Sequence, residues 1–162
     1  MLLVNKSLIS FLILLAGLLA SLTYAQNEYL DEAGWEWFNN SSQFFNQAFS
    51  MASTGAVPTA ISQQYSVTLT QLFEASVALE SDLRDLQGQY QQTTGTIPFD
   101  LVYLTTSVGA LSSAISSLTD YYQQLQSPTD DPINLQNALR LAHLNNTIYW
   151  LSLTLYYEKS QE

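Results

Sequence analysis

One stretch of this chain, residues 98–126, limits the fold more than any other feature, because its large apolar residues recur at alternating spacings of three and four. Such spacing puts them on one side of an α-helix and matches the seam along which helices pack together, whereas a β-strand has a period of two. Small residues between the seam positions allow neighbouring helices to approach closely. The seam consists of Leu101, Leu104, Val108, Leu111, Ile115, Leu118, Tyr122 and Leu125.

Turn residues divide the rest of the chain into three more segments with helical periodicity. Gly55 and Gly95 can adopt the left-handed conformation that ends a helix, and Asp131 before Pro132 is a favourable helix start. Short links between helices favour antiparallel neighbours. We therefore predict an all-α, antiparallel, up-down-up-down four-helix bundle, with helices at about residues 29–53, 59–92, 98–126 and 132–158.

The first and last segments have apolar seams of their own, which we expect to face the core. In the first segment the seam is Leu30, Ala33, Trp37, Phe44, Ala48 and Met51. In the last it is Leu141, Leu144, Ile148, Leu151 and Leu155, again at spacings of three and four.

The N-terminus resembles a secretory leader. A short region with one cation, Lys6, precedes the uncharged apolar stretch 8–22, and small residues at Thr23 and Ala25 suit cleavage before Gln26. We predict a signal peptide at residues 1–25, a single domain at residues 26–162, and a secreted, extracellular protein.

The charge balance limits the partners. The formal net charge is −10, with only four Lys or Arg residues against 14 Asp or Glu. Nucleic acid and anionic membranes require a cationic face, so we expect neither as a partner. The chain has no cysteine and must fold without disulfides.

No motif indicates catalysis. His143 is the only histidine, and we interpret it as a surface residue; a zinc site would need several His or Cys ligands. Acidic residues near the first helix start are interpreted as favourable partners of its N-terminus rather than as cation ligands. They are Glu28, Asp31, Glu32 and Glu36. We therefore predict a non-enzymatic protein without catalytic residues, metal or cofactor. The alternative is a hydrolase with one of the many serines as nucleophile, although no Gly-x-Ser-x-Gly motif is present.

Apolar residues away from the seams have two interpretations: a broad core face, or an exposed aromatic ridge that binds a partner. The second interpretation predicts an interaction or assembly protein with aromatic patches on the first and fourth helices. Its residues are Trp35, Phe38, Phe45, Phe49, Tyr149, Trp150, Leu153 and Tyr157, with Trp35 and Trp150 the strongest candidates.

The partner predicted by this interpretation is another protein, a second copy of the chain, or an apolar surface or lipid. The alternative function is an extracellular carrier that encloses a lipid or other apolar ligand inside the bundle. Asn-x-Ser/Thr sequons make Asn39, Asn40 and Asn145 candidates for glycosylation.

Overall fold

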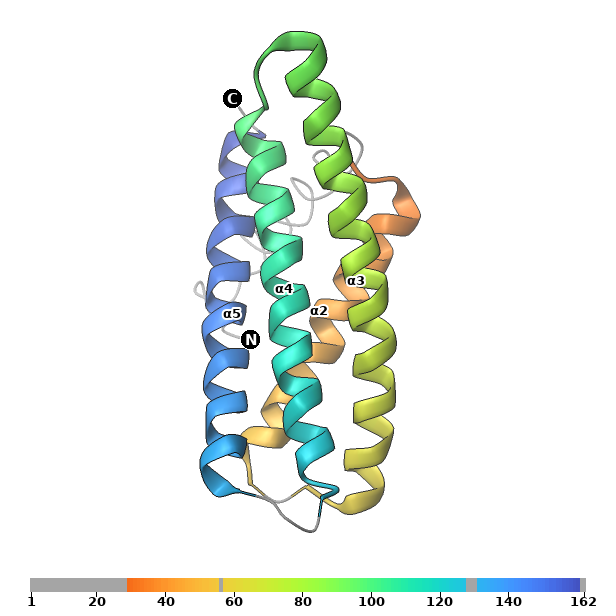
Figure 1. Ribbon diagram of the computed structural model, residues 1–162, viewed down its shortest axis with the longest axis vertical. Coiled ribbons are helices and arrows are strands. Elements are labelled where there is room, and N and C mark those ends of the chain that lie inside the picture. The colour runs from red at the N-terminus through yellow and green to blue at the C-terminus, as the bar shows by residue number, and fades with distance from the viewer. Residues whose placement is uncertain (1–28, 56, 128–130, 161–162) are drawn as a thin grey trace, which may run out of the picture.

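The computed structural model describes residues 29–55, 57–127 and 131–160, which form four α-helices packed against one another and no β-strand (Figure 1). The helices are α2 (Glu32–Ser53), α3 (Thr59–Thr94), α4 (Phe99–Gln124) and α5 (Pro132–Lys159), close to the expected ranges. The all-α class is thus confirmed for these residues. The expected leader at residues 1–25 lies outside them.

Helix α4 is the central element, with α3 along one side and α5 along the other, while α2 crosses behind them obliquely (Figure 1). All the expected seam residues of α4 are buried except Leu125, which is half-buried. The α4 helix is long and apolar enough to cross a membrane, with a mean hydropathy of 1.4 in its most apolar window, yet 61% of that window is buried. Its place in the core accounts for its apolar character.

Close packing of α4 is visible in hydrogen bonds from small side chains to neighbouring backbones. The Ser107 hydroxyl of α4 donates to the Tyr149 carbonyl of α5 over 3.3 Å. From α3, the Ser62 hydroxyl donates to the Tyr122 carbonyl of α4 over 2.8 Å. Small residues therefore serve as the contact surface between these helices.

Helix α5 is rotated relative to the sequence-based expectation. Leu141, Leu144 and Leu151, expected in the core, are 53%, 55% and 61% exposed, so that expectation is wrong. The buried face lies roughly a third of a turn away, at about 100° per residue. It consists of Ala138, Ala142, Tyr149, Ser152, Leu153 and Tyr156. This face includes small residues, and its tyrosines reach α2.

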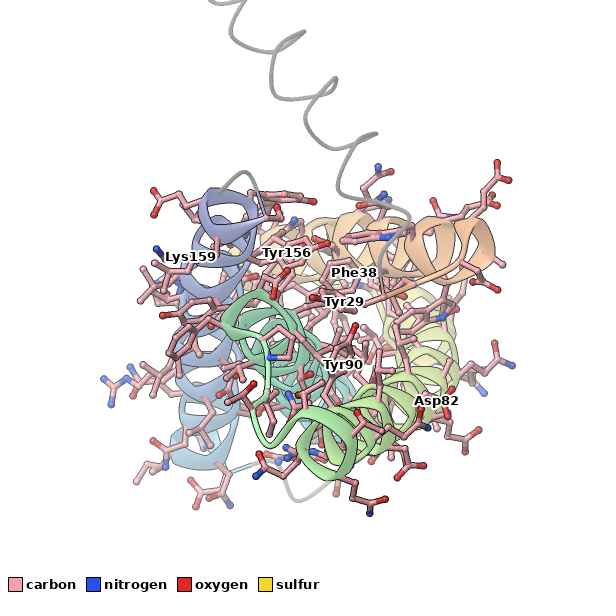
Figure 2. The ribbon with its side chains drawn as sticks, turned by 90° about the horizontal axis from the view of Figure 1, so that it is seen from above. Tyr29, Phe38, Asp82, Tyr90, Tyr156 and Lys159 are labelled. Atoms are coloured by element: carbon pink, nitrogen blue, oxygen red, sulfur yellow. The ribbon has the colours of Figure 1, made fainter. Side chains whose placement is uncertain are left out.

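Helix α2 also presents a different face from the one expected. Ala33 is exposed and Trp37 and Phe44 are half-buried, whereas Trp35, Phe38 and Phe45 are at most 2% exposed. Phe38 packs edge to face on Tyr149 at a centroid distance of 5.7 Å, and Trp35 lies 5.9 Å from the ring of Tyr156. Seen from above, Phe38 and Tyr156 lie inside the bundle while Asp82 lies at its periphery (Figure 2). Aromatic rings therefore bridge α2 and α5.

The helix ends follow the turn chemistry of the sequence. Asp31 caps α2 by accepting a 2.7 Å hydrogen bond from the Gly34 amide, and Asp131 caps α5 by accepting a 2.9 Å bond from the Ile133 amide. Gly95 ends α3 with φ of 75°, in the left-handed region that favours glycine.

Candidate interaction surface

The outer face of α5 carries a row of exposed apolar side chains, here called the α5 strip: Leu141, Leu144, Ile148 and Leu151. They are 53%, 55%, 39% and 61% exposed. Their spacings of three, four and three place them along one line of the helix surface. Leu155 continues the line and is partly exposed. Isolated exposed leucines are common in proteins, but a continuous row is typical of a binding surface.

The stretch of α5 that carries the strip is uncharged. Residues 141–157 contain no Asp, Glu, Lys or Arg, although Glu80 and Arg84 of α3 line the same groove as Ile148. Thr147 and Thr154 are exposed next to the strip. A partner that covers the strip would therefore displace water mainly from apolar and neutral groups of α5.

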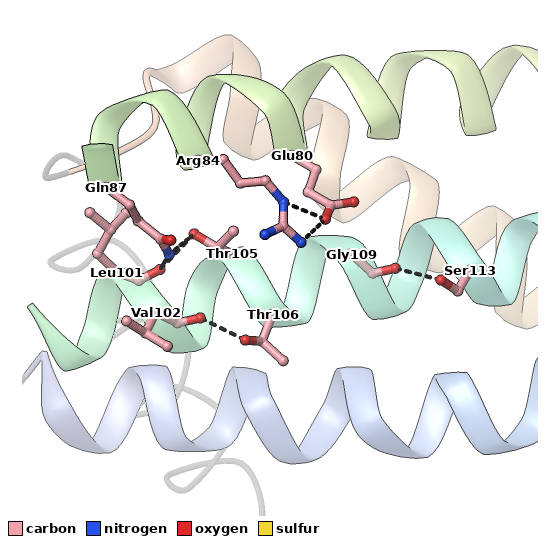
Figure 3. A network of polar contacts seen from close by, with 9 residues as sticks. All are labelled: Glu80, Arg84, Gln87, Leu101, Val102, Thr105, Thr106, Gly109 and Ser113. Carbon is pink, nitrogen blue, oxygen red and sulfur yellow. Dashed lines mark hydrogen bonds and ion pairs between the residues drawn. The ribbon is translucent and has the colours of Figure 1, made fainter. Parts of the chain in front are cut away.

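A shallow groove of about 330 Å³ begins at Ile148 and Asn145 on α5 and extends over α4 to α3. Its floor includes Thr106, Gly109 and Ser113 of α4. The opposite wall is polar: on α3, Arg84 donates to Glu80 from Nε over 2.9 Å and from Nη2 over 2.5 Å (Figure 3).

A glycine at position 109 allows the Glu80 carboxylate to lie close to α4, because a Cβ there would be only 2.9 Å from Glu80 Oε1. Along the same side of α4, the Gln87 amide donates to the Thr105 hydroxyl over 2.8 Å (Figure 3). The groove is thus apolar at its α5 edge and polar at its α3 edge. At the polar edge, Arg84 and Glu80 bond to each other, and on α4 the Thr106 and Ser113 hydroxyls donate to backbone carbonyls of their own helix.

The residues predicted to form an exposed aromatic ridge fall into two groups in the structure, one buried and one partly accessible. Trp35, Phe38 and Phe45 on α2 are buried, so the expectation that they face solvent is wrong. On α5, Tyr149 and Leu153 are 2% and 6% exposed, and these also belong to the core. The broad-core interpretation therefore describes these five residues.

The remaining ridge residues are more accessible. Phe49 and Tyr157 are half-buried, and Phe49 stacks on the ring of His143 at a centroid distance of 5.9 Å. Trp150 is 47% exposed, with its ring against that of Tyr149. Of the two tryptophans singled out from the sequence, only Trp150 is available to a partner.

Burial changes the pKa of two tyrosines on α5, Tyr149 and Tyr157. Burial raises the pKa of Tyr149 to about 12, and its hydroxyl donates to the Ser42 hydroxyl over 2.9 Å. Burial also raises the pKa of Tyr157. Among the described residues, the hydroxyl of Tyr157 and the indole nitrogen of Trp35 are buried without a hydrogen-bond partner. Both tyrosines are therefore neutral at physiological pH.

The candidate glycosylation residues lie on helices. Asn40 is exposed on α2, Asn39 beside it is half-buried, and Asn145 is half-buried at the edge of the groove. His143 is exposed, as interpreted from the sequence. Within residues 29–55, 57–127 and 131–160, no three His, Cys, Asp or Glu side chains are grouped as metal ligands would be.

Sequence reasoning missed the exposure of the α5 strip, because the spacing of a seam indicates a contact surface without indicating which contact. The sequence does contain a feature that indicates the buried face, about a third of a turn away from the leucines. Ala138, Ala142 and Ser152 form a line of small residues there, and α4 is rich in small residues too. Two such faces can approach more closely than a leucine face can.

Comparison with protein-family models, curated proteins and solved structures finds no match to this chain. The candidate surface therefore rests on the geometry and chemistry described above.

Proposed function

We propose that this protein is a secreted, non-enzymatic interaction or assembly protein, an up-down-up-down antiparallel bundle that binds its partner through the outer face of α5. The observation that supports it is the α5 strip, a continuous apolar row on an uncharged stretch of an otherwise acidic chain. The antiparallel arrangement is supported by the order of colours along the helices (Figure 1). Secretion is supported by the leader-like residues 1–25.

The sequence predicted binding patches on the first and fourth helices, which are α2 and α5. The burial of side chains supports a binding surface on α5 alone. The aromatic face of α2 contributes to the core, which leaves the α5 strip as the proposed binding face; Trp150 is also exposed, but on another side of α5. The rings of α2 and α5 contact one another inside the bundle. This packing favours binding at the surface over enclosure of a lipid.

Retention on an apolar matrix such as octyl-agarose tests the proposal. The variant Leu144→Gln/Leu151→Gln replaces the two most exposed leucines of the strip with a residue of similar helix propensity. We expect the wild-type protein to be retained and the variant to elute markedly earlier. The proposed function fails if both elute together.

A matched control is available on α3. Val67 is 55% exposed, as much as Leu144, but it lies outside the strip. Val67→Gln should leave retention close to that of the wild type. Equal losses for Val67→Gln and for the α5 variant would show that general surface hydrophobicity, rather than this face, governs binding.

A further inference from the structure

We infer that the partner of the α5 strip is a second copy of this chain, with the two α5 helices packed antiparallel about a twofold axis. This inference rests on the proposed function, since it requires the strip to be a binding surface. It adds the identity of the partner and the geometry of the contact.

The first argument is the spacing of the strip. Leu141, Leu144, Ile148, Leu151 and Leu155 follow the three-four repeat of a two-helix seam, in which each side chain inserts between residues of the facing helix. A seam of this kind is complementary to another seam, including its own copy. A twofold pair uses the same patch on both partners, as in most homodimers.

The second argument is the distribution of charge. The protein has a formal net charge of −10, so two copies repel each other over most of their surfaces. Helices α2, α3 and α4 each carry more acidic than basic residues. In α5, Arg140 and Lys159 stand against Glu158 alone. A second copy therefore meets the least repulsion on α5.

The third argument concerns direction. Arg140 and Glu158 lie at opposite ends of the uncharged run, on the same side of α5 at about 100° per residue. In an antiparallel pair whose twofold axis passes between Ile148 and Leu151, Ile148 faces Leu151 of the second copy. Arg140 then comes within one helical turn of Glu158 of the second copy. A parallel pair would instead keep Arg140 of one copy and Glu158 of the other at opposite ends of the contact, roughly 27 Å apart at 1.5 Å per residue.

Sedimentation velocity over a range of protein concentrations tests the dimer. We expect the wild-type protein to reach the mass of a dimer, and Leu144→Gln/Leu151→Gln to raise the dissociation constant by about 100-fold or more, since Leu151 lies beside the twofold axis and Leu144 faces Leu155 of the second copy. Val67→Gln should leave the dimer unchanged. Helical circular dichroism and urea unfolding verify that each variant is folded.

Cross-linking tests the direction, because the chain has no cysteine and an introduced one is the only thiol. Arg140→Cys and Glu158→Cys leave the strip intact. An antiparallel pair predicts that the mixture of these two variants forms disulfide-linked heterodimers faster than either variant alone forms homodimers. Faster homodimers of Arg140→Cys would overturn the antiparallel geometry.

The outcomes separate this inference from the proposed function. Suppose that the wild-type protein stays monomeric but the α5 variant still loses retention on octyl-agarose. This result would refute the dimer and would still support the α5 strip as a binding surface. A dimer that persists in the α5 variant places the contact elsewhere and overturns the inference. A monomer without differential retention refutes both proposals.

Discussion

Two apolar rows of this molecule, the aromatic row of α2 and the leucine row of α5, occupy opposite environments. Trp35, Phe38 and Phe45 are almost completely buried, whereas Leu144 and Leu151 are more than half exposed. The leucine row is continuous along one side of α5, whereas Ser41 and Ser42 separate Phe38 from Phe45 on α2. Hydrophobicity alone therefore does not determine which face of a helix is buried in this fold.

The difference lies in what each helix packs against. Helix α5 packs along α4, where the Ser107 hydroxyl donates to the Tyr149 carbonyl, and it buries small residues while the leucines of the α5 strip remain exposed. Helix α2 crosses obliquely, and large rings reach from it to Tyr149 and Tyr156. Burial in this bundle thus depends on the distance between helices as well as on side-chain polarity.

The largest effect on the free energy of unfolding is expected from substitution of the buried tryptophan, and the exposed tryptophan provides the comparison. Trp35→Ala should lower the free energy of unfolding by about 3 to 5 kcal/mol, because it removes a buried ring from the core. Trp150→Ala, at a half-exposed position, should lower it by less than about 1 kcal/mol. Urea denaturation followed by circular dichroism measures both. Equal losses would contradict the assignment of the two faces.

A test of intermediate size uses pH, because the buried face of α5 includes Tyr149. Burial raises its pKa from 10.0 to about 12, so the folded state favours the neutral phenol. Its contribution to stability is complete below pH 10 and is lost as the pH rises through 12. A shift of this size corresponds to about 2 to 3 kcal/mol.

Urea unfolding at several pH values between 9 and 12 measures this effect. Tyr149→Phe is the control, and its stability should fall less steeply over the same range. The buried tyrosines Tyr122 and Tyr157, whose pKa values are also raised by burial, account for the fall that remains. A stability that stays constant up to pH 12 would refute the burial of these hydroxyls.

A smaller effect is expected at the helix starts, which are alike in α2 and α5. Asp31→Ala and Asp131→Ala should each lower the free energy of unfolding by about 1 kcal/mol, because each removes a side-chain acceptor for a helix amide. Asparagine at either position should retain most of the stability. Losses that differ strongly between the two would show that one helix contributes less to the cooperative fold.

The smallest effect is expected across the groove from the α5 strip. Arg84, whose side chain is 65% exposed, pairs with Glu80 one turn away on α3. Arg84→Gln should change the free energy of unfolding by only about 0.3 to 0.5 kcal/mol, the usual range for such a pair. Thermal denaturation at low and high salt measures it. A larger change would indicate that the Glu80 carboxylate, held near Gly109, depends on Arg84.

The sequence was sufficient to predict four helices and the core face of α4, because that helix has neighbours on both sides and its repeat is regular. It was not sufficient for α2 and α5. Each of these has two apolar faces, and the choice between them depends on contacts with the neighbouring helices, which are not local in the sequence. The exposed strip of α5 follows from that choice and so escaped prediction.

Hydrogen bonds from neutral hydroxyl groups connect the helices of this bundle at several points. Tyr122 donates to the Ala48 carbonyl over 2.6 Å, Tyr149 to Ser42, and Ser62 to Tyr122. Bonds of this type are not screened by dissolved salt and do not titrate between acidic and mildly alkaline conditions. The alignment of the helices should thus survive wide changes in the salt concentration and pH of the surrounding solution.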